Sequence, residues 1–412
     1  MLVLHAASEP QVAVIDSVAC QKPDRKEGQR SFQTAPVTNE ALPYGRASDK
    51  NPMRILQICS AREVGGGEKH LADLANALAQ RGHDVFAALS PGSPVRSLLS
   101  SVAPPNIVEL PMRNSLNLAT AMKLSRLVRA QQIEIVHAHI ARDYPLAALA
   151  IGRSKASLVL TRHVLFPLSR IHKLTLRRTA RVIAVSRAVA NSLYAQRIFD
   201  RQKIVTIHNG IDIAKFAGAS SGTRSNRQPL RVGTIGHLAP IKGQEDFVRA
   251  AVFVNQRRND VEFFIAGADK SPEQPNQKTL EKLISEERMA SHIHIIGWVD
   301  DVAAFLSTLD IFVSSARSEP FGLSIVEAMA AGVPVIATAS EGAREIIEDN
   351  QSGRIVPIAD PASLAHSLTE LLHDEAERRR LSLNGQTAAR EHFCLERMVE
   401  QTEGVYLQAR TA

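Results

Sequence analysis

The segment from Asp310 to Gly332, DIFVSSARSEPFGLSIVEAMAAG, constrains the fold of this chain more than any other. It begins with a short apolar run typical of a buried strand, and its second part has the spacing of a helix that ends at Gly332. The first amides of a helix have no carbonyl partner within the helix, so they bind anions with the help of the helix dipole. The segment therefore predicts a strand, a turn and an anion-binding helix start at Phe321, Gly322 and Leu323.

Two glutamates flank this helix start, Glu319 on the turn and Glu327 one turn inside the helix. A carboxylate at the second position is suited to accept hydrogen bonds from ribose hydroxyls, as the acidic residue of dinucleotide-binding folds does. Two glutamates eight residues apart are common by chance, so the spacing alone does not define a site. Together with Glu-Pro-Phe-Gly-Leu, however, it resembles the E-x7-E signature of retaining family 4 glycosyltransferases. The resemblance implies that Glu319 faces the donor sugar, Glu327 holds the ribose, and the amides of Phe321, Gly322 and Leu323 bind the diphosphate.

Strand-like runs alternate with helical patterns through both halves of the chain, which predicts two parallel α/β domains. The resemblance implies the GT-B architecture, in which two Rossmann-like domains face each other across a cleft. We expect a disordered extension over residues 1–52, which a mis-assigned start codon would explain. An acceptor-side domain over 53–216, a linker over 217–229 and a nucleotide-sugar-binding domain over 230–390 follow. The resemblance also implies that residues 391–412 form a helix returning to the first domain, with Phe393 and Tyr406 packing there.

A glycine run, Gly65-Gly66-Gly67, stands between the first expected strand and a helical pattern. Such a run lets backbone approach a phosphate or a sugar, although for the glycines alone a flexible turn is the favoured interpretation. The family carries a Gly-Gly-x-Glu loop at this place. The resemblance implies that Gly65, Gly66 and Glu68 line the cleft near the donor phosphates and the acceptor.

Histidines follow two of the expected strands of the first half. His137 and His139 close one strand, and carboxyl ends of strands are where open α/β sheets bind ligands. A His-x-His pair is also a possible metal site, but no third ligand is evident, so packing or hydrogen bonding is the simpler interpretation. The resemblance implies that His139 lines the cleft without a metal and that His163 lies beside the transferred sugar.

The second half opens with a strand followed by Gly236-His237-Leu238 and the pair Lys242-Gly243. Lys242 suits a phosphate as a point charge on a long stem, whereas an isolated lysine would simply be solvated. The family usually has arginine where this chain has His237, and both basic residues then neutralise the donor diphosphate. A neutral histidine has no full charge, so we expect weaker diphosphate binding here or help from another residue, for which Arg317 is one possibility.

Two further acidic positions bear on the site. The pair Asp300-Asp301 precedes a helical pattern, which favours a helix cap over a metal site. Gly342 and Glu345 match a family loop near the donor, while Glu341 replaces its first glycine. The motifs therefore predict no metal ligand set in the second half.

Composition limits the class of protein. Three scattered cysteines are too few for a disulfide framework, which favours a reducing cytoplasm, and no apolar run has the length of a membrane-crossing helix. Lysine and arginine exceed acids by 22 to 9 between Met53 and Asp212, whereas acids exceed bases by 27 to 21 after it. Between Tyr144 and Phe199 there are ten basic residues and no acid. This segment suits an anionic membrane surface, or equally an ordinary solvated face, and no motif for nucleic acid accompanies it.

The resemblance implies a hexosyltransferase-type enzyme that retains the anomeric configuration and needs neither metal nor cofactor. Its partners would be a UDP-, GDP- or ADP-sugar and a carbohydrate or lipid-linked acceptor, in polysaccharide, lipopolysaccharide or glycolipid assembly. We expect a cytoplasmic protein, peripheral at the inner face of the membrane. Two alternatives remain at this point: a nucleotide-sugar epimerase of the same fold, and a non-catalytic nucleotide-sugar-binding protein.

Overall fold

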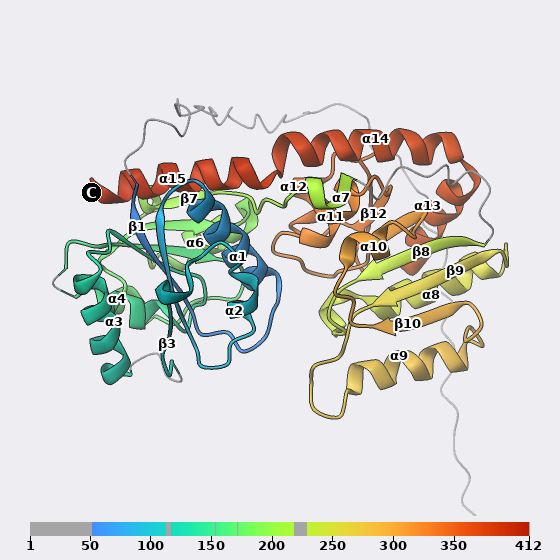
Figure 1. Cartoon of the computed structure of the whole chain (residues 1–412). Helices are drawn as coiled ribbons and strands as arrows, with labels where there is room; N and C mark the ends of the chain where they lie inside the picture. Colours follow the sequence, from blue (N-terminus) through green and yellow to red (C-terminus); the bar gives the residue numbers. More distant parts are fainter. Residues whose placement is uncertain (1–51, 113–116, 153, 171, 218–228, 412) are drawn as a thin grey trace, which may run out of the picture. The chain divides into compact units, whose positions relative to one another are not determined.

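The computed structural model describes residues 52–112, 117–152, 154–170, 172–217 and 229–411. The expected N-terminal extension up to residue 51 and the linker residues 218–228 lie outside the described residues. The described part forms two parallel β-sheets with helices on their faces (Figure 1). The expected α/β class with two Rossmann-like units is therefore confirmed.

The first sheet has seven parallel strands in the order β3-β2-β1-β4-β5-β6-β7. Ile55 in β1 pairs with Val85 on one side and Ile135 on the other, so β1 and β4 lie side by side where the strand order reverses. Ligands bind beyond the strand ends at such a reversal in open α/β sheets. The strands are β1 Arg54–Cys59, β2 Asp84–Leu89, β3 Ile107–Glu109, β4 Ile135–Ala138, β5 Ser157–Arg162, β6 Thr179–Ala184 and β7 Ile204–Thr206.

Helices cover both faces of this sheet. On one face, Leu71 and Met398 belong to an apolar cluster with Ile55, Ile135 and Val159 of the strands. On the other face, residues of three further helices pack against alternate strand residues, which is why these strands are apolar throughout. The helices of this half are α1 Gly66–Gln80, α2 Val95–Leu98, α3 Leu118–Ala130, α4 Tyr144–Ile151, α5 His172–Thr175, α6 Arg187–Gln196 and α7 Ala214–Ala217.

The second sheet has six parallel strands in the order β10-β9-β8-β11-β12-β13. Phe247, Phe263 and Leu368 anchor the apolar cluster on one face, and Phe312 and Ile325 lie in the cluster on the other. The strands are β8 Leu230–Ile235, β9 Val261–Ala266, β10 Ile293–Gly297, β11 Ile311–Ser314, β12 Val335–Thr338 and β13 Arg354–Val356. The helices are α8 Gln244–Asn255, α9 Pro275–Glu286, α10 Val302–Leu306, α11 Leu323–Ala330, α12 Ala343–Ile346 and α13 Pro361–His373.

Two long helices end the chain, α14 Glu375–His392 and α15 Leu395–Arg410 (Figure 1). Helix α14 packs on α11 of the second half, whereas α15 packs on α1 and on β4, β5 and β6 of the first half. Tyr406 is fully buried in the first-half cluster and Phe393 is buried at the junction of the two helices. Among the described residues, no helix combines the length and the apolar character needed to cross a membrane.

Candidate active site

A cavity of about 370 Å³ lies at the carboxyl ends of strands from both sheets. Such strand ends are where α/β folds bind nucleotides. Of the residues that the sequence analysis placed at or near the donor, those that do not line it are Glu68, His139, Arg317, Glu341, Gly342 and Glu345. The lining includes Gly65, Gly66, His163, His237, Lys242, Glu319, Phe321, Gly322, Leu323 and Glu327.

The start of α11 forms one wall of the cavity. Gly322 is its N-cap and has a φ of 108°, a conformation that favours glycine because a side chain would strain it. The first amides of α11 have no carbonyl four residues earlier within the helix, so they are available to an acceptor in the cavity. The turn therefore presents amide donors without a side chain in front of them.

Glu319 and Lys242 meet in the same cavity, with Lys242 Nζ 2.5 Å from Glu319 Oε2. Lys242 ends a short 3-10 helix, Pro240–Lys242, that follows β8. Both side chains are largely shielded from solvent, so the ion pair is stronger than a surface pair. An anionic ligand entering the cavity would compete with Glu319 for the ammonium group.

Glu327 lies deeper in the wall, and its side chain is 11% exposed. Burial raises the pKa of its carboxyl, the neighbouring Asp73 adds to the rise, and Lys69 opposes it. Lys69 Nζ lies 3.9 Å from Glu327 Oε1. A buried carboxylate whose nearest cation lies 3.9 Å away keeps oxygen lone pairs, as an acceptor for hydroxyl groups requires.

His237 occupies the opposite part of the lining with Trp298. Burial lowers the pKa of His237, and the charges of Lys270 and Lys242 lower it further, so the ring is neutral at pH 7. The Lys270 ammonium lies 4.7 Å from the centre of the Trp298 ring. Arg317 does not substitute for the missing arginine, because Asp246 holds its guanidinium by hydrogen bonds of 3.0 and 3.1 Å and it lines a different cavity.

The glycine loop approaches the second half closely. A Cβ on Gly66 would lie 3.1 Å from a methyl carbon of Leu323, and one on Gly67 would lie 3.4 Å from the His163 ring. Glu68 turns back to its own helix, where its Oε2 accepts a hydrogen bond of 2.9 Å from the amide of Gly65. Glu68 also lines a neighbouring cavity with Arg142.

His139 lies behind His163 and away from the cavity lining. Its Nε2–H donates to Gln57 Oε1 over 2.8 Å, and its ring centre is 5.8 Å from that of His163. His139 therefore does not form part of the cavity wall. Asp301 caps α10 by accepting from the amide of Ala304, which confirms the cap predicted for that pair.

Two family models match the chain in order. Residues 64–215 match the model described as Glycosyltransferase Family 4, and residues 220–388 match Glycosyl transferases group 1. The chain belongs to the family 4 glycosyltransferases of the GT-B fold. The family that the resemblance implied is thereby confirmed, whereas the E-x7-E signature and the retention of configuration stay predictions.

Named relatives of this glycosyltransferase act on several acceptors. It is 29% identical to the phosphatidyl-myo-inositol mannosyltransferase of Mycobacterium tuberculosis, over 82% of this chain and 93% of the relative. It is 26% identical to the lipopolysaccharide core biosynthesis glycosyltransferase LpsE of Rhizobium meliloti, over 84% and 95%. These relatives favour sugar transfer over the epimerase and the non-catalytic binding protein.

The solved structure of Anabaena Alr3699/HepE in complex with UDP-glucose has the same fold as this glycosyltransferase. The TM-score is 0.75 at 23% sequence identity, and the match covers 85% of this chain and 98% of that one. At this identity the likeness concerns the fold alone.

The cavity is also lined by residues that the sequence analysis did not predict there. Lys69, Asn209 and Trp298 line it, although Lys69 looks like an ordinary helix-surface lysine in the sequence. For Asn209 the sequence does contain an indication, because this residue belongs to an Asn-Gly pair that follows β7. Glu345, expected near the donor, instead accepts hydrogen bonds from the amides of Arg187 and Ala188 at the start of α6.

Proposed function

We propose that this glycosyltransferase moves a sugar from a nucleoside diphosphate sugar to an acceptor hydroxyl with retention of configuration and without a metal. The observation that carries the proposal is the convergence of Glu319, Glu327, Lys242 and the α11 amides on one cavity. Its volume of about 370 Å³ is in the range of small-molecule sites. In this arrangement the α11 amides and Lys242 bind the diphosphate, and Glu327 accepts from the ribose.

Transfer would depend mainly on electrostatic stabilisation of the leaving diphosphate. Positive charge from Lys242 and from the α11 N-terminus is already positioned before the bond breaks, which is the most effective form of such stabilisation. Glu319 is paired with Lys242, unlike the nucleophile of retaining hydrolases, which faces a second carboxyl across the bond. We therefore favour a same-face substitution, in which the leaving phosphate accepts the acceptor's proton. An excess of chelator should not lower turnover.

The cavity leaves the nucleotide to be identified by experiment. Trp298 provides a flat apolar wall beside His237, which suits stacking of a nucleobase. Thermal shift with UDP-, GDP- and ADP-sugars should show one donor that raises the melting temperature at concentrations where the others do not. NMR of the product anomer then tests retention.

Kinetics of two variants test the roles of the glutamates. Replacing Glu327 by Ala should mainly raise KM for the donor, by about tenfold, because it removes the hydroxyl acceptor. Replacing Glu319 by Gln should lower kcat by about 10²-fold, the size seen when one group that stabilises the transition state is lost. Wild-type kinetics in both variants would refute the assignment.

We further propose a cytoplasmic protein that binds the anionic inner face of the membrane through a surface formed by α3, α4 and α5. These helices pack in series, and they expose Leu118, Met122, Leu149 and Leu174, with Phe166 on the adjacent loop. Exposed basic residues belong to α3 and α5 or directly follow α5, namely Lys123, Arg126, Arg129, Lys173, Arg177 and Arg178. Apolar side chains among cations are typical of surfaces that bind anionic lipid.

Liposome flotation tests this surface. Binding should rise with the fraction of phosphatidylglycerol, fall with added salt, and drop at least about tenfold when Phe166 and Leu174 are both replaced by Ser. Replacing Leu383, equally exposed on α14, provides the control. Absence of binding at low salt would remove the proposal and would leave the sugar-transfer assignment untouched.

A further inference from the structure

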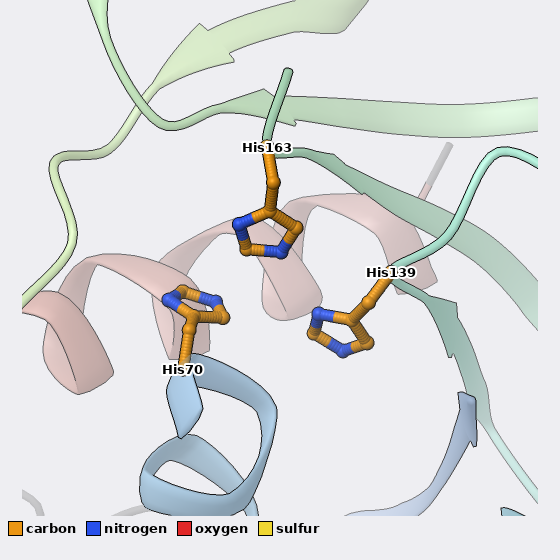
Figure 2. A group of neighbouring side chains, drawn as sticks. All are labelled: His70, His139 and His163. Carbon is orange, nitrogen blue, oxygen red and sulfur yellow. The ribbon is translucent and has the colours of Figure 1, made fainter. Parts of the chain in front are cut away.

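Three histidines converge behind the wall of the cavity. His70 is on α1, His139 follows β4 and His163 follows β5. One ring nitrogen from each lies within 4.8 Å of those of the other two. Figure 2 shows the three rings turned toward a common centre. The sequence predicted no metal because no third ligand was evident for the His-x-His pair; the fold instead joins only His139 of that pair to His70 and His163.

Hydrogen bonds leave these rings with free lone pairs. The Gln57 side chain donates to Tyr406 Oη, so its oxygen accepts from His139 Nε2–H and the Nδ1 of His139 carries a lone pair. Among the described residues, no partner contacts the buried Nδ1 of His70 or His139, or the buried Nε2 of His163. His137, by contrast, uses both ring nitrogens, with Tyr406 Oη and Thr161 Oγ1 at 2.7 Å.

The surroundings keep the rings neutral, which is the form that binds metals. Burial lowers the pKa of His70 to about 4 and holds the pKa values of His139 and His163 well below their usual range. Gln57 is the kind of hydrogen-bond acceptor that fixes the tautomer and orientation of a metal-binding histidine. The buried side chain of Asn209 interacts with His70 and lines the cavity with His163, so its Oδ1 is a candidate fourth ligand, as is a water molecule.

We propose that His70, His139 and His163 bind one divalent transition-metal ion, such as Zn²⁺ or Co²⁺, and that the bound ion inhibits sugar transfer. Three imidazoles with one open position suit these ions and not Mg²⁺ or Ca²⁺, which prefer oxygen ligands. At a tetrahedral Zn²⁺ the nitrogens would lie about 3.4 Å apart, so the rings need to close by roughly 1 Å. The inhibition rests on the proposed function, because the bound ion would hold His163, whose side chain lines the cavity proposed for the sugar donor.

Cobalt titration of the full chain, purified without metal, tests the site independently of activity. One equivalent of Co²⁺ should produce the intense visible absorption of four-coordinate cobalt with nitrogen ligands, and one equivalent of Zn²⁺ should abolish it. His70→Leu should weaken Co²⁺ binding at least about 100-fold, whereas His366→Ala, exposed on α13, should leave it unchanged. His163→Asn serves as the second variant if His70→Leu unfolds. Absence of the absorption at equimolar Co²⁺, or equal binding by a folded variant and the wild type, would overturn the site.

To test inhibition, turnover is measured with and without Zn²⁺. Turnover with Zn²⁺ should be at least tenfold lower than turnover without it in the wild type, and the two rates should be nearly equal in His70→Leu. A bound ion without inhibition would overturn the regulatory part and leave the site standing. Absence of transfer under every condition would refute the proposed function instead, since the cobalt spectrum does not depend on it.

Discussion

Glu327, for which we propose a role in binding ribose, has its carboxyl group in an unfavourable environment. Its pKa is raised, chiefly by burial, above its ordinary value of 4.5. Any stability linked to this group is therefore fully present below pH 4.5 and is lost as the pH rises through the folded value. Above the folded pKa the protein therefore carries a buried charge that destabilises it.

Replacing Glu327 by Gln should raise the melting temperature at pH 7 to 8 by about 2 °C, corresponding to roughly 1 kcal/mol. The difference from wild type should shrink as the pH falls towards and below 4.5, because the carboxyl then becomes protonated in the folded and, last, in the unfolded chain. The same variant should bind the donor about tenfold more weakly. Thermal melts from pH 4.5 to 8 check the first effect and donor titration the second, with exposed Glu281→Gln as control. A lower melting temperature at pH 8 would contradict the argument.

Residues that follow predicted strands were the most predictable part of the site. Glu319, Lys242 and His163 follow β11, β8 and β5, and carboxyl ends of parallel strands meet at one edge of a sheet. Partners separated in the chain were not predictable. The pairing of Lys242 with Glu319, and the position of His70, depend on how the chain folds and not on local pattern.

At the scale of elements, the sequence predicted the alternation of strands and helices better than the ends of helices. The returning helix was expected over 391–412, but in the structure α14 runs on to His392 and α15 begins at Leu395. There the amide of Ile211 donates to the carbonyl of Phe393, and the amide of Leu395 donates to that of Ile211. A Cβ on Gly210 would lie 2.5 Å from the carbonyl oxygen of Cys394, so the Asn-Gly turn makes room for this crossing. Local periodicity contains no information on such a distant backbone contact.

Glu345 joins α12 to the start of α6. Its carboxylate accepts from the amides of Arg187 and Ala188 at 2.8 and 2.9 Å, and from His208 Nε2 at 3.1 Å. Burial alone would raise the pKa of Glu345, but these three hydrogen bonds outweigh it and the pKa is lowered. The stability contributed by this group is therefore present above pH 4.5 and is lost as the pH falls through the lowered value.

Replacing Glu345 by Ala should destabilise the protein by about 1–2 kcal/mol at pH 7, since two amides at a helix start lose their acceptor. Urea denaturation at pH 7 measures this loss, and exposed Glu287→Ala provides the control. At a pH well below 4.5 the two curves should converge. A constant difference down to the lowest pH at which the fold survives would contradict the proposed role of the charge.

At the scale of the whole molecule, composition and periodicity predicted two α/β units and an uneven charge distribution. They did not predict which surface α15 covers; that expectation came from the family resemblance. The structure shows the physical basis in Tyr406, whose side chain is fully buried against the first sheet. Its hydroxyl accepts from Gln57 Nε2 on β1 and donates to His137 Nδ1 on β4.

Tyr406→Phe should therefore weaken the attachment of α15 to the first sheet. Burial raises the pKa of the phenol, so the hydroxyl stays protonated and remains a donor at every pH at which the protein is folded. Its removal leaves His137 Nδ1 and the Gln57 amide without a partner in an apolar core, which costs about 1–3 kcal/mol.

Hydrogen exchange should show faster exchange of α15 amides in Tyr406→Phe, together with a lower melting temperature. Tyr194→Phe, half-buried on α6, should change neither. Because the same hydroxyl orients Gln57 and through it His139, the variant should also weaken cobalt binding; unchanged exchange and unchanged cobalt affinity would show that packing alone holds the helix.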